Sequence, residues 1–458
     1  MESVEFKVRD LSSLRCGICR TTENPGSLTF VSTRAPGRNP YIRRVIDEEL
    51  DLLFPELPAI LLDGPKAVGK TETALQRCAT VRRLDVAAER AVIEADPRVV
   101  WTDRKPVLID EWQRVPDVFD AVRGLVDHDG TGGQYLLTGS APVRGTHSGA
   151  GRITPLRMRP LCLSERDIET PTVSFAELLS GKRVAVGGRT SIGLESYVDE
   201  IIAGGFPGMR HLSKRTLQIQ LDGYLQRIVD HDLPEAGIAV RRPAAVLAWL
   251  KAYAAATSTS ASWETIRKAA TSGVDNKPAR DTTIAYTELL KGLRILDPID
   301  AWTTSRNTFT RLSLAPKHHL ADPALAARLL DRTRQHLLAG DNGPVPVPND
   351  GSLLGNLFES LAALSIRTYA QAAAASTYHL RTEQGRHEVD FVIEHDGKVL
   401  ALEVKLSADV NNKAVEHLLW LADELGTNLL DAVVLTTGPE AYRRNDGVAV
   451  VPLALLGP

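Results

Sequence analysis

Cysteine is scarce in this chain of 458 residues, which has only Cys16, Cys19, Cys78 and Cys162. Four cysteines are too few for a disulfide framework at this length, which predicts a reducing, cytoplasmic compartment. Cys16 and Cys19 form one CxxC pair, but no second Cys or His pair lies nearby in the sequence to complete a zinc site. We therefore interpret both as reduced thiols.

Long apolar runs and an excess of one charge are also missing. No window reaches the ~20 apolar residues that a membrane-spanning helix requires, and no signal peptide is recognisable at the N-terminus. The formal net charge is −3, so contact with nucleic acid would need a local basic patch. A hydrophobic content of 43% with 24% charged residues is typical of globular domains, and the length predicts two or three of them.

A complete phosphate-binding motif follows the first predicted buried strand, the apolar run 59–63. The motif is GxxxxGK[ST], and we expect all eight residues to bind nucleotide: Gly64, Pro65, Lys66, Ala67, Val68, Gly69, Lys70 and Thr71. Glycines let backbone N–H groups surround the phosphates, and the following helix N-terminus adds partial positive charge. Lys70 would contact the β- and γ-phosphates while the Thr71 hydroxyl ligates Mg²⁺. The motif therefore predicts that the chain binds and hydrolyses ATP with Mg²⁺.

Two further predicted strands end in polar side chains. The run 106–110 ends at Asp110, which we expect to bind Mg²⁺, and the adjacent Glu111 would orient or deprotonate the attacking water. The run 134–138 ends at Thr138. Either Thr138 or Ser140 is placed to sense the γ-phosphate or hold the water, and the sequence does not choose between them.

An arginine on a glycine-rich stretch is the candidate for stabilising charge in the transition state. Arg152 ends the run 145–152, and Arg144 is the reserve. Such an arginine acts in its own subunit or in a neighbouring one. A solvated loop arginine is the alternative.

Strands alternate with helices through this region, which predicts a parallel α/β sheet with the ligand site at the carboxyl ends of the strands. We expect the five strands near residues 59–63, 81–84, 106–110, 134–138 and 157–161.

The middle of the chain is expected to be helical. Residues 194–235 have helical periodicity that is interrupted at 204–208, which predicts a lid on the ATPase core. Three helical stretches follow, and then two short strand-like runs, an order typical of a winged helix: 243–255, 262–270, 279–291, 293–300 and 309–314. The third helix would read DNA, with phosphate contacts from Lys277, Arg280, Lys291, Arg306 and Arg311. Interleaved acidic residues leave protein contact open as the alternative.

A new domain is predicted after the Pro/Gly-rich linker 340–350. It begins with a helix over 353–369, followed by two strands joined at Asp396-Gly397, a strong hairpin signal. Asp390 begins one strand, and Glu403 and Lys405 share a face at the end of the other. We expect Asp390 and Glu403 to hold a divalent metal, with Glu359 completing the site, and Lys405 to position the water.

Together these motifs resemble those of prokaryotic AAA-type ATPases with a helical middle and a C-terminal restriction-endonuclease-like, PD-(D/E)xK domain. The matching segments are Leu-Asp-Gly-Pro-Lys-Ala-Val-Gly-Lys-Thr (62–71), Val-Leu-Ile-Asp-Glu-Trp-Gln (107–113), Leu-Leu-Thr-Gly-Ser (136–140), Gly-Arg (151–152) and Gly-Gly-Phe-Pro (204–207), together with the C-terminal carboxylates. Trp112 departs from the smaller aliphatic residue usual in the family, and Val389 stands where the motif's name has proline. The resemblance implies ATP as the nucleotide, a nuclease-like C-terminal fold and homo-oligomers, but no substrate.

The expected fold class is α/β, with a helical middle, in six segments: an N-terminal extension (1–40), an AAA-type P-loop ATPase core with a parallel sheet (41–180), a helical lid (181–242), a winged-helix-like domain (243–339), a linker (340–350) and a PD-(D/E)xK nuclease-like α/β domain (351–458). The leading hypothesis is an ATPase that cuts DNA or RNA with Mg²⁺. The alternatives are a regulatory ATPase that binds nucleic acid without cutting it, and an ATPase that acts on a protein partner.

Overall fold

The computed structural model describes residues 40–139, 150–235, 243–270, 280–303, 314–339, 353–382 and 385–458. Contacts divide the chain into residues 1–41 and a compact unit, residues 42–458. The predicted linker 340–350 and the Cys16–Cys19 pair lie outside the described residues. Within the described part of the chain, no helix is both long enough and apolar enough to cross a membrane.

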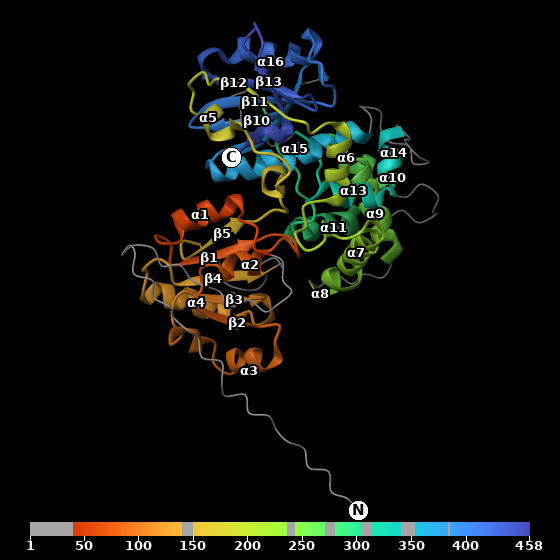
Figure 1. Cartoon of the computed structure of the whole chain (residues 1–458). Helices are drawn as coiled ribbons and strands as arrows, with labels where there is room; N and C mark the ends of the chain where they lie inside the picture. The colour runs from red at the N-terminus through yellow and green to blue at the C-terminus, as the bar shows by residue number, and fades with distance from the viewer. Residues whose placement is uncertain are drawn as a thin grey trace, which may run out of the picture. The chain divides into compact units, whose positions relative to one another are not determined.

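A five-stranded parallel sheet forms the first part of the compact unit (Figure 1), which confirms the predicted parallel α/β core. Its strand order is β2-β3-β4-β1-β5, with bounds β1 Ala59–Asp63, β2 Thr80–Arg83, β3 Val107–Asp110, β4 Tyr135–Gly139 and β5 Ile153–Arg157. Apolar side chains alternate between its faces, so one face packs against α1 (Val45–Leu53) and α2 (Lys70–Leu75). The other face packs against α3 (Ala87–Ala95) and α4 (Asp117–His128).

The fifth strand begins four residues before the expected position of 157–161. Ile153 pairs with Ala59, and Arg157 pairs with Asp63. The strand therefore ends at Arg157, the residue at which it was predicted to begin. The error arises because β5 lies at the edge of the sheet. Thr154 is half-buried and Pro155 is exposed, so this strand has no continuous apolar run in the sequence. Proline is tolerated there because edge strands leave some N–H groups unpaired.

Helices fill the middle of the chain. Those close to their expected ranges are α6 Leu194–Ala203, α7 Lys214–Arg227, η4 Ile228–Asp232, α8 Leu233–Glu235, α9 Pro243–Ala255, α10 Trp263–Ala269 and α11 Arg280–Gly292. Helices α13 Pro323–Leu329 and α14 Arg334–Ala339 were not predicted. The break at residues 204–208 has a direct cause. Gly204 has φ 68°, and a Cβ on Gly205 would lie 2.5 Å from the carbonyl oxygen of Leu161. The Gly205 N–H donates to the buried Asp322 carboxylate at 2.6 Å, which fixes the turn.

The first strand-like run expected after α11, residues 293–300, pairs with a segment that was not predicted. Leu296 bridges Leu320, and Ile299 bridges Lys317, both antiparallel, so the partner segment is 317–320. Of the predicted run 309–314, only Leu314 lies within the described residues.

The C-terminal sheet draws strands from three parts of the chain. Its order is β7-β13-β14-β12-β11-β10-β9-β8, with bounds β7 Gly188–Arg189, β8 Ala301–Trp302, β9 Ser376–Arg381, β10 Glu388–His395, β11 Lys398–Lys405, β12 Leu429–Thr436, β13 Glu440–Arg443 and β14 Ala449–Pro452. Helices α15 (Leu353–Ala372) and α16 (Asn412–Leu425) pack on opposite faces. Both hairpin residues take left-handed φ, Asp396 at 48° and Gly397 at 74°, as a two-residue β-turn requires.

The remaining short elements are η1 Pro97–Trp101, η2 Trp112–Arg114, η3 Leu163–Arg166, β6 Val173–Ser174, α5 Phe175–Leu179, η6 Gly426–Asn428, η7 Leu453–Leu455 and β15 Leu456–Gly457. Strands β6 and β15 pair with each other, so residues from before α6 also contact residues 456–457.

Candidate functional site

The P-loop lies at the carboxyl end of β1, in a tight turn that requires glycine. A Cβ on Gly64 would lie 2.1 Å from the carbonyl oxygen of Met158, the residue after β5. Gly69 adopts φ 99° and Ala67 φ 65°, both in the left-handed region. This backbone turns the loop between β1 and α2, as expected for a phosphate cradle.

Lys70 is buried, and its ammonium is turned back onto the loop. Its Nζ donates to the carbonyl oxygens of Gly64 and Pro65, both at 2.8 Å. Burial lowers the pKa of Lys70 to about 8, against the opposing effect of the Glu111, Asp63 and Asp110 carboxylates. Binding of a phosphate would give this ammonium a stronger, charged acceptor than the two carbonyls.

Asp110 meets two hydroxyls at the same edge of the sheet. Thr71 Oγ1 donates to Asp110 Oδ1 at 2.7 Å, and Thr138 Oγ1 donates to the same oxygen at 2.5 Å. Asp110 and Thr138 are buried. A hydroxyl and a carboxylate in contact fit the few protein ligands that Mg²⁺ takes when phosphates supply the others. Thr71 and Asp110 are therefore the residues that would hold Mg²⁺.

Glu111 lies next to this cluster in a left-handed conformation, with φ 58°. Its carboxylate accepts a hydrogen bond from the Gln113 amide. Gly139 is needed beside it, because a Cβ there would lie 2.6 Å from both Gln113 Oε1 and Trp112 Nε1. The turn after β3 therefore packs directly on the end of β4, and of the two sensor candidates only Thr138 lies within the described residues.

Arg152 lies at the other end of the sheet from the P-loop. It precedes Ile153, which pairs with the first residue of β1, whereas the P-loop follows the last. Five residues of strand separate the two positions by about 16 Å. Arg152 instead pairs with Asp127 at 2.7 Å. The expectation that it acts on phosphates in its own subunit is therefore corrected, and the reserve Arg144 lies outside the described residues.

Residues distant in sequence hold the P-loop from outside. Lys66 Nζ pairs with Asp232 Oδ1 of the π-helical turn η4 at 2.6 Å. Arg44 Nη1 donates to the Val68 carbonyl oxygen at 2.9 Å. Arg294 Nη2 lies 2.6 Å from Asp63 Oδ2, directly before Gly64. Residues from η4 and from the position before α1 thus contact the loop, and a residue after α11 contacts the position directly before it.

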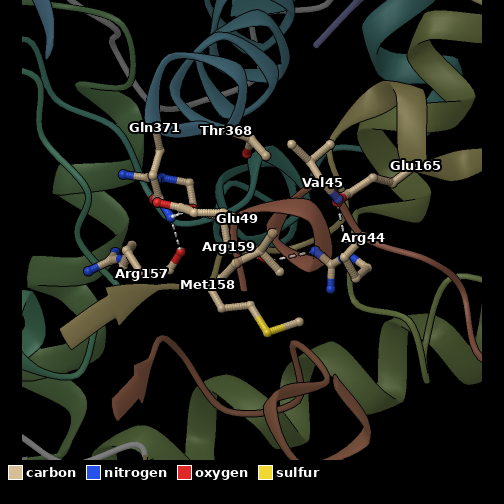
Figure 2. A pocket seen from close by; sticks show the side chains of 10 residues that line it. Arg44, Val45, Glu49, Arg157, Met158, Arg159, Glu165, Thr368 and Gln371 are labelled. Carbon is tan, nitrogen blue, oxygen red and sulfur yellow. Dashed lines mark hydrogen bonds and ion pairs between the residues drawn. The ribbon is translucent and has the colours of Figure 1, made fainter. Parts of the chain in front are cut away.

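A small cavity marks the junction between the ATPase core and α15 (Figure 2). Gln371 of α15 donates to Glu49 Oε2 at 2.9 Å and to the Arg157 carbonyl oxygen at 2.8 Å. Its Oε1 accepts from Arg159 Nη1 at 3.0 Å. Arg44 Nη2 donates to the Arg159 carbonyl oxygen at 2.8 Å, so a short chain of hydrogen bonds joins the P-loop to α15.

The C-terminal carboxylates also come together. Asp390 Oδ2 accepts from the Val404 N–H at 2.8 Å, across the β10–β11 pair. Glu403 Oε1 pairs with Lys405 Nζ at 2.6 Å. Burial raises the pKa of Glu403 to about 8, with a further contribution from the Asp390 charge.

A lysine from the middle segment completes this cluster, which the sequence did not predict. Lys317 Nζ lies 2.9 Å from both Asp390 Oδ1 and Glu359 Oε1. Burial raises the pKa of Glu359 to about 8, and the Asp390 charge adds to this effect. Across the described residues, no group of three or more Asp, Glu, His or Cys side chains is placed to hold a metal. The expected metal set of Asp390, Glu403 and Glu359 is therefore corrected: these carboxylates bind ammonium and N–H groups, which does not fit a metal ion.

The expected DNA-reading helix exposes a mixed surface. Exposed positions on α11 include Arg280, Asp281, Ile284 and Glu288. Lys291 pairs with Glu288 at 3.4 Å and lies over the Trp263 ring. No basic stripe forms on this helix, and Lys277, Arg306 and Arg311 lie outside the described residues.

Comparison with known proteins identifies three segments. Residues 56–166 match the family model described as AAA domain. Residues 194–336 and 354–456 match two domains of unknown function, DUF8612 and DUF4143. The AAA match and the geometry around Lys70 agree, so this segment is a P-loop ATPase domain of the AAA type. That part of the expected resemblance is confirmed. The family that matches the C-terminal residues is described only as a domain of unknown function, so this match names no activity.

Two curated relatives are similar over most of the chain. They are the uncharacterized proteins Mb2031c of Mycobacterium bovis and Rv2008c of Mycobacterium tuberculosis, each 26% identical over 362 residues, covering 76% of this chain and 70% of theirs. Among solved structures, the Walker-type ATPase PABY2304 of Pyrococcus abyssi is similar at 16% identity, with a TM-score of 0.36, covering 62% of this chain and 94% of that one.

Proposed function

We propose that this protein is a Mg²⁺-dependent ATPase whose nucleotide state controls its C-terminal domain. The observation that carries the proposal is the convergence of Thr71 and Thr138 on Asp110, beside the buried Lys70, at the carboxyl edge of the sheet. This is the edge where parallel α/β sheets bind ligands.

The chain's own residues supply the steps of hydrolysis. Lys70 would leave the Gly64 and Pro65 carbonyls and neutralise charge on the β- and γ-phosphates. Mg²⁺, held by Thr71 and Asp110, would supply further charge neutralisation. Glu111 would accept the proton of the attacking water, and Gln113 holds its carboxylate in place.

The P-loop contacts support a route from nucleotide to C-terminal domain. Movement of Val68 when phosphates bind would act on Arg44, and through the Arg159 backbone on Gln371. Gln371 lies at the end of α15, the helix that also carries Glu359. Coupling of this kind requires that nucleotide favours one of two arrangements of the junction.

Substitutions at Lys70 and Glu111 distinguish the binding of ATP from its hydrolysis. Lys70→Ala should abolish ATP binding, measured with a fluorescent ATP analogue. Glu111→Gln should retain binding but lower the hydrolysis rate by about 10²- to 10⁴-fold, as expected for loss of a general base. Unchanged hydrolysis in Lys70→Ala would overturn the ATPase assignment.

Cleavage of nucleic acid is the second candidate function. It is favoured by Asp390 and Glu403 on paired strands with Lys405 beside them, the PD-(D/E)xK pattern. A metal ion there would require these carboxylates to release the ammonium and N–H groups that they bind in the structure. Cleavage of single- and double-stranded DNA and RNA with Mg²⁺ or Mn²⁺, with and without ATP, tests it beside Lys405→Ala. Cleavage that is lost in the variant supports a nuclease. No cleavage by an ATPase-competent protein favours a regulatory ATPase that acts on DNA or a protein partner.

Assembly into homo-oligomers would give Arg152 a role in a neighbouring site. The side chain is 45% exposed and forms its ion pair with a half-exposed Asp127, so another subunit could engage it. Loss of hydrolysis in Arg152→Ala, rescued by mixing with Glu111→Gln subunits, would support this role. If the Arg152→Ala protein alone hydrolyses ATP at the parental rate, Arg152 has no role in a neighbouring site.

A further inference from the structure

A cavity of about 520 Å³ lies between helices α6, α7, α13 and α14. Its volume falls within the range of ~300–1,000 Å³ that is usual for small-molecule sites. All of its lining residues lie within the segment 194–336, which matches a domain of unknown function. The cavity therefore belongs to a part of the chain for which the comparisons name no activity.

The floor of the cavity is apolar and lies below the surface of the protein. Leu217 and Leu221 of α7 line it together with Ala324 and Ala327 of α13, and each of these residues is at most 5% exposed. Among the apolar residues of the lining, Leu212 alone is exposed, at 37%. A surface that docks another protein presents a patch of exposed apolar side chains. A recessed floor of this kind suits the apolar body of a small molecule instead.

The charged part of the lining is mostly basic. It has a single carboxylate, that of Asp199. The cations come from three helices and from the turns beside them, and they are Arg210, Lys214, Arg328, Arg332 and Arg334. An apolar floor combined with cations is complementary to a molecule that has an apolar body and an anionic head.

Acidic partners hold two of these arginines in place and leave N–H donors unused. Arg328 Nε and Nη2 donate to the Asp222 carboxylate at 2.6 and 3.0 Å. Arg334 Nε donates to Asp199 at 2.8 Å, and its Nη2 donates to Glu195 at 2.6 Å. In both guanidinium groups, Nη1 makes no hydrogen bond with the residues that the structure describes. Because a guanidinium carries five N–H donors, these arginines can still donate to an anion in the cavity.

We propose that this cavity binds a small amphipathic anion. Its carboxylate, phosphate or sulfonate head would accept from the basic residues of the lining, and its apolar body would lie over α7 and α13. Lys214, the first residue of α7, is exposed and forms no ion pair with any residue in the described ranges, so its ammonium is available to the head.

Helix α7 also connects the cavity with the P-loop. Leu217, Leu221 and Tyr224 follow one another at helical spacing, and the Tyr224 hydroxyl donates to the Lys66 carbonyl oxygen at 3.3 Å. The turn η4 follows α7 directly and holds the Lys66 ammonium through Asp232 at 2.6 Å. A ligand in the cavity should therefore change the affinity for ATP, and this consequence rests on the proposed ATPase function.

Fluorescence titration of the full chain with 8-anilinonaphthalene-1-sulfonate tests the site. The matched control ligand is N-phenyl-1-naphthylamine, which has the same rings without the sulfonate group. The folded protein should bind one equivalent of the sulfonate, at least about 10-fold more tightly than the uncharged amine, because hydrogen bonds to a charged group are the stronger ones. Equal affinities for the two ligands would overturn the proposal.

Two variants with the same change of charge locate the bound sulfonate. Lys214→Glu should weaken its binding at least about 3-fold, because a carboxylate then replaces a cation of the lining. Arg215→Glu changes an exposed neighbour that does not line the cavity and should leave the affinity unchanged. Equal affinities in these two variants would place the ligand elsewhere and overturn the proposal.

Two further variants test the position of the site independently. Ala203→Leu fills part of the cavity from a half-buried position and should also weaken sulfonate binding. Lys70→Ala removes a cation from the nucleotide site and should bind the sulfonate as tightly as the parent does. Loss of sulfonate binding in Lys70→Ala would place the ligand at the P-loop and overturn the proposal, as would parental affinity in a folded Ala203→Leu protein.

Equilibrium dialysis with radiolabelled ATP tests the connection to the P-loop. Saturating sulfonate should change the Kd for ATP at least about 5-fold, a usual size for coupling between two sites. The same sulfonate concentration should have a smaller effect on Lys214→Glu. An unchanged Kd for ATP would overturn the connection. Absence of ATP binding by the unmodified protein would reject the ATPase and leave the sulfonate result standing, whereas loss of sulfonate binding alone would reject the site and leave the ATPase.

Discussion

Arg294 holds Asp63, the residue directly before the first P-loop glycine, with 2.6 Å between Nη2 and Oδ2. The two residues are 231 positions apart. Arg294 itself has a left-handed φ of 63°, in the turn directly after α11. A change in the P-loop can therefore reach the middle segment through one ion pair.

This pair should contribute modestly to stability. The Arg294 side chain is 41% exposed and that of Asp63 is 18% exposed, so solvent screens their attraction. We expect a coupling free energy of about 0.5–1 kcal/mol in a double-mutant cycle of Arg294→Gln and Asp63→Asn. Thermal unfolding measures the cycle with and without ATP. Strictly additive single effects in both conditions would show that the pair carries no coupling.

The Thr138 hydroxyl should affect both the stability of the protein and its use of Mg²⁺, because it donates a hydrogen bond to Asp110. Thr138→Val removes a hydrogen bond to a buried carboxylate and should cost about 1.5–3 kcal/mol of stability. It should also weaken the Mg²⁺ dependence of ATP hydrolysis, because Asp110 is then oriented by Thr71 alone. Thr138→Ser keeps the hydroxyl and is the control. Equal Mg²⁺ titrations for the valine and serine variants would contradict this role.

Gly139 should be intolerant of a methyl group. Gly139→Ala places a Cβ 2.6 Å from both Trp112 and Gln113, so we expect a loss of about 1–3 kcal/mol from overpacking. Gly124, an exposed position in α4 with nothing within 4 Å of its added Cβ, is the matched control. Gly124→Ala should stabilise the protein by up to about 1 kcal/mol through helix propensity. Chemical denaturation compares the two, and similar effects would refute the packing argument.

Acid should destabilise the protein through two buried histidines, one in the middle segment and one in strand β9 of the C-terminal sheet. Burial lowers the pKa of both His318 and His379 to about 4, with smaller contributions from Lys291 and Lys317 respectively. Because their pKa values are lower in the folded state, their contribution is present above about pH 6.5 and is lost as the pH falls toward 4. Each contributes roughly 3 kcal/mol at most across this window.

Unfolding by urea between pH 4 and 7 measures this dependence. The double variant His318→Gln and His379→Gln should show a flatter stability profile than the parent over that range. The exposed His211→Gln is the control and should leave the profile unchanged. A double variant with the parental slope would show that other groups cause the acid sensitivity.

The ATPase core could be predicted from sequence because its signals are local. The P-loop between Asp63 and Thr71, and the polar ends of β3 and β4, follow apolar runs that parallel strands bring to one edge. The hairpin at Asp396-Gly397 was predictable for the same reason, since its turn chemistry lies within two residues.

The contacts that join these parts could not be predicted in this way. Lys317 reads as an ordinary basic residue in a Pro-His-rich stretch, and only the fold brings it to Asp390, 73 residues later. Gln371 and Arg44 likewise act through partners far away in sequence. Edge strand β5 was misplaced because an edge strand carries a weak apolar pattern.

The C-terminal sheet also constrains how the gene can be divided. Its two outermost strands, β7 and β8, are encoded before residue 303, whereas its centre is encoded after residue 375. A fragment beginning at residue 351 would lack both outer strands and leave two rows of backbone N–H and C=O groups unpaired. The C-terminal domain is therefore not a detachable module appended to the ATPase domain. It is interwoven with the middle of the polypeptide, so truncation should release aggregation-prone edges and not an autonomous domain.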